Sequence, residues 1–226
     1  AGEPGIGKTR LLDQFVSEAE RRGSRAHWGR CWEVGGAPAF WPWIQALRDL
    51  LAERGVPRVQ SWLGDGRADL AQLLPEPGAS REGDLDDQSA RFRLFDAISR
   101  LLASAAQDAP LVVVLDDLHA ADRSSLELLY FVARAAHRMR ALVLCTHRDH
   151  EVRASPELSE IFGRIGREGS RIEMGRFHVP EVALYVARAA RVAPSSEFVS
   201  AMHRLTEGNP LFVDAVMRLL AARGDL

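Results

Sequence analysis

Lysine is almost absent from this sequence, although basic residues are not. The 226 residues contain 29 lysines and arginines together, and Lys8 is the single lysine among them. A coding preference for arginine explains the avoidance of lysine elsewhere but not this exception. A lysine ammonium is a compact charge on a flexible stem, whereas the guanidinium of arginine is planar and differs in reach. The exception therefore points to a position that needs lysine chemistry.

Long apolar runs and a strong charge imbalance are also missing. No apolar run approaches the roughly 20 residues of a membrane span, and no basic and then apolar leader opens the chain. We therefore expect a cytoplasmic protein without membrane contact. The formal net charge of −2 provides no general attraction to nucleic-acid phosphates, so DNA binding would need a domain outside this sequence.

Cysteine is scarce, with only Cys31 and Cys145 in the chain. The two residues lie far apart, and each belongs to an apolar, strand-like stretch. A metal pair or a catalytic thiol is one interpretation, but small buried residues fit such positions better. We therefore leave both cysteines out of the predicted site.

The beginning of the chain matches the pattern G-x-x-x-x-G-K-[ST] of a phosphate-binding loop. Glycines let backbone N–H groups converge on phosphate oxygens, and the following helix adds its positive N-terminal end. Lys8 is expected to contact the phosphates of ATP, and the hydroxyl of Thr9 to bind Mg²⁺. The predicted nucleotide contacts in this region are Gly2, Glu3, Pro4, Gly5, Ile6, Gly7, Lys8, Thr9 and Arg10.

A phosphate-binding loop normally follows a buried strand, yet only Ala1 precedes Gly2. We therefore expect the first strand to be missing and the sequence to be a fragment of a longer protein. That strand would lie between a strand at Leu142–Thr146 and a short one at Arg171–Met174. These two strands are accordingly predicted to lie too far apart to pair.

Strand-like and helical segments alternate over most of the chain, which predicts a parallel sheet with helices on both faces. Leu111–Leu115 is an unbroken apolar run, as expected for a strand buried on both sides. From Pro180 onward the pattern is purely helical. We therefore predict an α/β core of the P-loop NTPase type over residues 1–178, truncated at its start, and a small helical lid over residues 179–226, truncated at its end.

Two adjacent carboxylates, Asp116 and Asp117, end the apolar run. An unpaired carboxylate at the end of a buried strand is costly unless a cation or a solvent-filled cleft receives it. Neighbouring strand residues point in different directions, so the two carboxylates can serve different purposes. We assign Asp116 to the Mg²⁺ shell and Asp117 to orienting or deprotonating the attacking water. The alternative is that the pair simply opens the next loop.

Taken together, these motifs resemble the STAND class of AAA-like ATPases. The likeness is strongest to the ATPase domain of large LuxR-type transcriptional regulators and of cyclase-linked signalling proteins, also described as an origin-recognition-like AAA domain. It extends over essentially the whole chain. The segments that carry it are Gly2–Thr9, Ala39–Trp43, Ala90–Phe95, Leu111–Asp122, Thr146–Asp149 and Gly208–Val213.

The resemblance implies two further site residues. The T-x-R motif of the family corresponds to Thr146 and Arg148, and its arginine senses the γ-phosphate. The G-x-P motif corresponds to Gly208 and Pro210, and its proline packs against adenine. The ordinary alternatives are a solvated arginine at a strand end and a turn that breaks a helix.

The sequence thus favours an ATP-dependent switch in signalling or transcription regulation, with slow hydrolysis to ADP and Mg²⁺ as cofactor. Lys8, Asp117 and Arg148 are its predicted catalytic residues. One alternative is an ATP or ADP sensor that does not hydrolyse. A DNA-binding module would depend on a domain absent from this sequence. We also expect self-association through the ATPase domain.

Overall fold

The computed structural model describes residues 1–33, 36–54, 61–62, 67–74 and 88–224. Contacts among them divide the chain into two compact units. The first unit comprises Leu12–Arg171, and the second combines Ala1–Leu11 with Ile172–Leu226. The phosphate-binding loop and the C-terminal helices therefore belong to the same unit.

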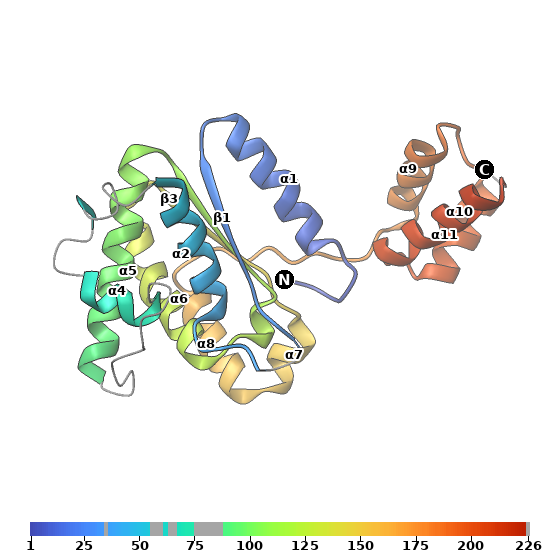
Figure 1. Ribbon diagram of the computed structural model, residues 1–226. Helices are drawn as coiled ribbons and strands as arrows, with labels where there is room; N and C mark the ends of the chain where they lie inside the picture. Colours follow the sequence, from blue (N-terminus) through green and yellow to red (C-terminus); the bar gives the residue numbers. More distant parts are fainter. Residues whose placement is uncertain (34–35, 55–60, 63–66, 75–87, 225–226) are drawn as a thin grey trace. The chain divides into compact units, whose positions relative to one another are not determined.

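A parallel sheet of three strands forms the centre of the first unit (Figure 1). The strands lie in the order β1-β2-β3. The apolar run predicted β2, and every residue of this strand is buried. Such complete burial suits a central parallel strand, because helices cover both of its faces. The predicted α/β class with a parallel sheet is confirmed. The strand bounds are β1 Arg25–Arg30, β2 Leu111–Asp116 and β3 Ala141–Cys145.

Alternate residues of β2 contact helices on opposite faces of the sheet. Val112 and Val114 pack with Leu12 and Val16 of α1. Leu111, like the other odd-numbered residues of the strand, faces the larger core that contains α2, α5 and α6. Among the described residues, no helix has the length and apolar character needed to span a bilayer. The helix bounds are α1 Lys8–Arg21, α2 Trp41–Arg54, α4 Arg67–Leu73, α5 Gln88–Asp108, α6 Arg123–Ala136, α7 Asp149–Ala154 and α8 Pro156–Gly166.

The loop after β2 is fixed by the N-cap of α6. The side chain of Asp122 accepts a hydrogen bond from the backbone N–H of Ser125 at 2.9 Å, which satisfies one of the free amides of the first helical turn. Its other carboxylate oxygen accepts from the backbone N–H of Phe40 at 3.0 Å. One carboxylate thus joins the start of α6 to the segment that leads into α2.

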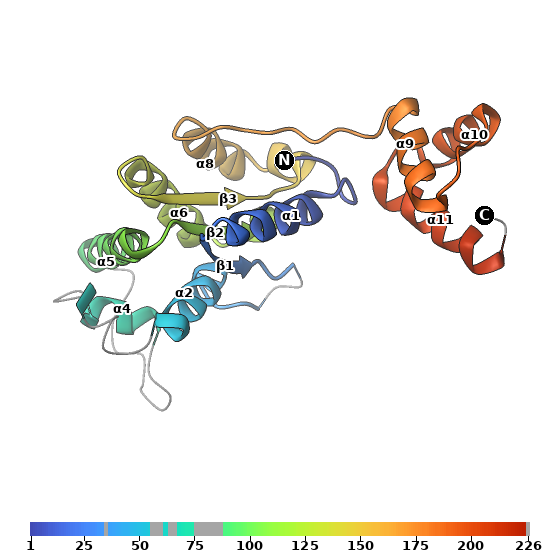
Figure 2. The ribbon, with the colours of Figure 1, turned by 90° about the horizontal axis from the view of Figure 1, so that it is seen from above.

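Three helices form the C-terminal part of the second unit, and Figure 2 shows them packed against one another. Their interface is apolar, with Val182, Val186, Val199, Met202, Val213 and Met217 buried. An amphipathic helix of 11 to 14 residues is stabilised mainly by such burial rather than by propensity. The bounds are α9 Val179–Ala190, α10 Ser196–Thr206 and α11 Pro210–Arg223.

The prediction of a strand at Arg171–Met174 is wrong, because this segment forms no strand. The backbone of this segment forms two hydrogen bonds with Ala1. The amide of Met174 donates to the carbonyl of Ala1 at 2.9 Å, and the terminal amino group of Ala1 donates to the carbonyl of Ile172 at 2.8 Å. Two bonds to a single residue do not make a ladder. The predicted gap between this strand and β3 is therefore undefined.

Candidate functional site

The phosphate-binding loop has a backbone that requires glycine. Gly5 has φ of 75° and Gly7 has φ of 96°, values that side chains disfavour. A Cβ atom at Gly5 would also lie 2.9 Å from Cβ of Leu211, closer than real contacts allow. The side chain of Lys8 turns back over the loop, where its ammonium donates to the carbonyls of Gly2 at 3.0 Å and Glu3 at 2.9 Å.

The start of α11 is hydrogen-bonded to this loop. Asn209 donates from its side-chain amide to the carbonyl of Pro4 at 3.1 Å, and the backbone N–H of Leu211 donates to the carbonyl of Gly5 at 3.1 Å. Asn209 also caps α11 through its side-chain oxygen, which accepts from the N–H of Leu211 at 3.0 Å. Pro210, the predicted adenine contact, lies between these two residues. The structure thus brings the loop and the G-x-P segment together.

Sequence reasoning missed Asn209 as a contact of the loop. An asparagine before a proline at the first helical position is read as a helix cap, which it is. Nothing in that local pattern indicates that the same side chain reaches Pro4, 205 residues earlier. Arg176 makes a second link of this kind, since it forms ion pairs with Glu3 at 2.9 Å and with Glu207.

At the carboxyl end of β2, the side chain of Asp116 is completely buried. One of its oxygens accepts a hydrogen bond from the hydroxyl of Thr146, which follows β3. The other oxygen accepts from Arg30, the last residue of β1, at 3.2 Å from Nε and 3.0 Å from Nη2. A buried carboxylate is tolerated only when such partners compensate for lost hydration.

Asp117 adopts a left-handed backbone conformation, with φ of 61°. Aspartate is one of the few side chains that tolerate this region, which costs most other residues about 1–2 kcal/mol. The conformation is held by a hydrogen bond from the N–H of Asp117 to the hydroxyl of Thr146 at 2.9 Å. Burial, followed by the charge of Asp116, raises the pKa of the Asp117 carboxyl above its ordinary value. A carboxylate with a raised pKa is better able to accept a proton.

Arg148 is held between two carboxylates. Its Nη1 lies 2.8 Å from Glu151, and its Nη2 bonds to Glu33, which follows β1. Neither acidic residue was part of the predicted site. The contact with Glu33 joins residues 115 positions apart, so no local pattern could indicate it. Thr146, Arg148, Asp116 and Asp117 therefore lie together at the carboxyl ends of β2 and β3.

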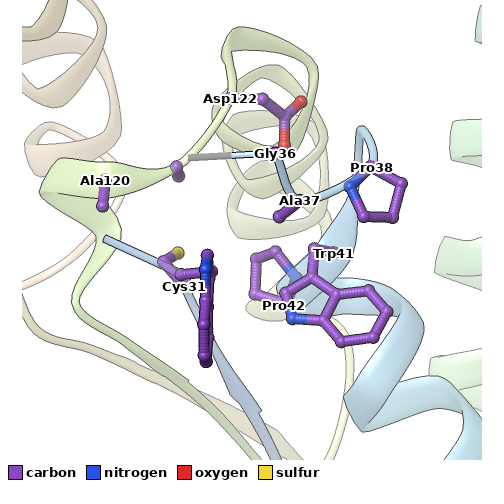
Figure 3. Close-up of a pocket in the computed structure, with 10 residues that line it drawn as sticks. Cys31, Gly36, Ala37, Pro38, Trp41, Pro42, Ala120 and Asp122 are labelled. Atoms are coloured by element: carbon purple, nitrogen blue, oxygen red, sulfur yellow. The ribbon is translucent and has the colours of Figure 1, made fainter. Parts of the chain in front are cut away.

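Beside this region lies a pocket of about 170 Å³, shown in Figure 3. Cys31 lines it, and burial raises the pKa of this thiol to about 12, so the thiol stays protonated near neutral pH. Burial raises the pKa of the Cys145 thiol to about 12 as well. Neither cysteine is thus suited to act as a nucleophile. Trp32 also lines the pocket and is 58% exposed.

In a comparison with protein families, residues 1–145 match the AAA ATPase domain. The matched region contains the phosphate-binding loop, the Asp116–Asp117 pair and all of β3. Thr146, Arg148 and the three C-terminal helices lie beyond it. Among curated proteins, no sequence matches the chain.

The hydroxyl of Thr146 is expected to stabilise the fold, because it serves both Asp116 and the N–H of Asp117. In Thr146→Val the shape is kept but both hydrogen bonds are lost, which should lower the free energy of unfolding by about 1–3 kcal/mol. Urea denaturation measures this loss. Thr146→Ser keeps the hydroxyl and is the matched control. If valine leaves the stability unchanged while serine lowers it, the methyl group matters and the hydrogen bonds do not.

Proposed function

The chain belongs to the AAA ATPase domain family, and from this premise we propose that it binds ATP with Mg²⁺ and hydrolyses it slowly. We propose further that the nucleotide state acts as a switch in signalling or transcription regulation, as in the STAND-class regulators that the sequence resembles. The observation that carries the proposal is the loop Gly2–Thr9, in which glycine conformations and a single lysine are combined at the start of a helix. Oriented amides and a helix N-terminus favour a phosphate at that place.

Lys8 is the first residue we assign to the phosphates. Its ammonium now donates to two carbonyls of its own loop, at 3.0 and 2.9 Å. Phosphate oxygens carry more negative charge than these carbonyls and make stronger, charge-assisted hydrogen bonds. Binding of ATP would therefore draw the ammonium from the loop backbone to the phosphates.

For Mg²⁺, we propose the hydroxyl of Thr9 and the carboxylate of Asp116 as ligands. Oxygen donors of this kind suit Mg²⁺, which retains several waters and also takes phosphate oxygens. Asp116 meets Arg30 and Thr146 in its buried position. A carboxylate that is already held by two partners needs little reorganisation to bind the ion, which favours binding.

Asp117 is our proposed base or orienting group for the attacking water. Its raised pKa and fixed left-handed backbone support this role, since carboxylates with a raised pKa or an unusual backbone conformation are frequent at active sites. A second candidate function is a sensor that binds ATP or ADP without turnover. The carboxylate at this position is aspartate and not the longer glutamate of strong ATPases, which is the observation that favours the sensor.

The switch requires that the nucleotide changes the arrangement of the helices in residues 179–226, our proposed lid. Asn209 and Leu211 bond to carbonyls of the phosphate-binding loop, so a change in the loop backbone reaches α11 directly. Pro210 is placed between them, and we propose that it packs against adenine. Any contact with DNA would be made by a domain outside this sequence, and self-association through the ATPase domain remains a proposal.

Lys8→Ala should abolish ATP binding, whereas Asp117→Asn should keep it and remove most of the turnover. Lys8 acts on the phosphates of the bound state, but Asp117 acts on the water in the transition state. Calorimetry measures the affinity, and phosphate release measures the turnover. Arg21→Ala, at the exposed end of α1, is the control for lost positive charge. Unchanged ATP affinity in Lys8→Ala would remove the phosphate assignment, and a wild type without phosphate release would favour the sensor.

Arg148→Ala should weaken ATP binding more than ADP binding, because only ATP carries the γ-phosphate. The guanidinium must leave Glu33 or Glu151 to reach a phosphate. Its contribution to the ATP binding free energy is therefore the difference between two charge-assisted contacts. We expect the ratio of ATP to ADP affinity to fall by about tenfold, which corresponds to 1.4 kcal/mol. Arg153→Ala, at an exposed arginine of α7, which begins directly after Arg148, should leave the ratio unchanged. Equal losses for both nucleotides would make Arg148 a structural residue.

A further inference from the structure

A buried histidine near Asp117 has no hydrogen-bond partner within the described residues. His119 lies in the short helix η2, Leu118–Ala120, and its side chain is only 1% exposed. Neither Nδ1 nor Nε2 forms a hydrogen bond. Burying polar nitrogens in this way costs about 1–3 kcal/mol for each group that stays unsatisfied. The site described so far gives this side chain no task.

The ring of His119 is directed at a group of carboxylates. Its Nε2 lies 3.5 Å from Oε1 of Glu33 and 3.8 Å from Oε2 of Glu151. One ligand atom each from Glu33, Asp117 and His119 lie within 4.8 Å of one another. The donors come from two places in the chain, the segment after β1 and the segment after β2. A buried nitrogen and two carboxylates therefore converge on one point.

The spacing of these atoms is that of ligands around a small ion. Two donors about 2.1 Å from a tetrahedral Zn²⁺ are separated by roughly 3.4 Å. The distance from Nε2 of His119 to Oε1 of Glu33 is 3.5 Å, which is close to this value but too long for a good hydrogen bond. The donor atom of Asp117 lies within 4.8 Å of the other two, so each distance must shorten by about 1.4 Å at most to reach the same geometry.

We propose that Glu33, Asp117 and His119 form a binding site for a divalent transition-metal ion of the Zn²⁺ type. An imidazole with two carboxylates suits Zn²⁺ and its neighbours in the first transition series, whereas Mg²⁺ prefers oxygen ligands alone. The site shares no ligand with the proposed Mg²⁺ shell of Thr9 and Asp116. A fourth position is open to water or to Glu151.

Arg148 competes with the metal for one of these ligands. Its Nη2 bonds to Oε1 of Glu33, the same oxygen that faces His119. A bound ion would displace the guanidinium from Glu33 through both occupancy and charge repulsion. The ion pair with Glu151, at 2.8 Å, can keep Arg148 nearby. Removing Arg148 is therefore expected to strengthen metal binding, which a purely structural role of His119 does not predict.

The test is titration of the nucleotide-free chain with Zn²⁺ by calorimetry and with Co²⁺ by visible absorption. We expect one ion per chain and tetrahedral absorption bands from Co²⁺. His119→Gln should weaken Zn²⁺ binding by more than about tenfold, and Arg148→Ala should strengthen it. His150→Gln is the matched control, because His150 is exposed and lies 3.7 Å from Glu151. It should bind Zn²⁺ as the wild type does.

Glu33→Gln tests the same site at a side chain that is 45% exposed, so its result stands even where His119→Gln impairs folding. Unchanged Zn²⁺ affinity in Glu33→Gln, or a wild type that binds no ion, would overturn the proposal and leave His119 as a packing residue. Loss of binding in His150→Gln would also overturn it. A thiolate band from Co²⁺ would assign the ion to Cys31 or Cys145 instead. No nucleotide is present, so these outcomes are independent of the proposed ATPase function.

Discussion

The buried carboxylate of Asp116 is the constraint on which the carboxyl end of the sheet depends. A charge without solvent must be compensated, and two partners of Asp116 come from neighbouring strand ends: Arg30 from β1 and Thr146 from the residue after β3. The same threonine hydroxyl accepts from the N–H of Asp117, and the carbonyl of Thr146 accepts from Leu118 at 2.8 Å. One buried charge thus fixes the ends of three strands and the turn that follows β2. The proposed base Asp117 lies in that turn, and so does His119, whose ring nitrogens make no hydrogen bond to any residue that the structure describes.

The phosphate-binding loop is organised in a similar way, but by backbone carbonyls. Lys8 donates hydrogen bonds to the carbonyls of Gly2 and Glu3. Asn209 donates to the carbonyl of Pro4, and Leu211 donates to that of Gly5. Lys8 and the start of α11 therefore bond to neighbouring carbonyls of the same short loop. A ligand that attracts Lys8 changes the environment of the carbonyls next to those that hold α11. This contact is the physical basis that we propose for a switch in which a bound phosphate acts on the proposed lid.

Sequence patterns predicted the parts of this molecule that depend on local order. The apolar run Leu111–Leu115 identified the central strand. The contacts of Arg148 with Glu33 and of Asn209 with Pro4 were not predictable, because they join residues more than a hundred positions apart. Arg171–Met174 was predicted as a strand because an extended segment resembles one in sequence, whether or not a neighbour pairs with it.

The central claim is that the chain binds ATP together with Mg²⁺. Variants of Thr9, whose hydroxyl is the proposed Mg²⁺ ligand, test this claim most directly. ATP affinity can be measured by calorimetry with and without Mg²⁺ for the wild type, Thr9→Ala and Thr9→Ser. The account predicts that Mg²⁺ strengthens ATP binding in the wild type and in Thr9→Ser, which keeps the hydroxyl, but has little effect in Thr9→Ala. The same Mg²⁺ effect in all three chains, or a wild type that binds no ATP, would contradict it.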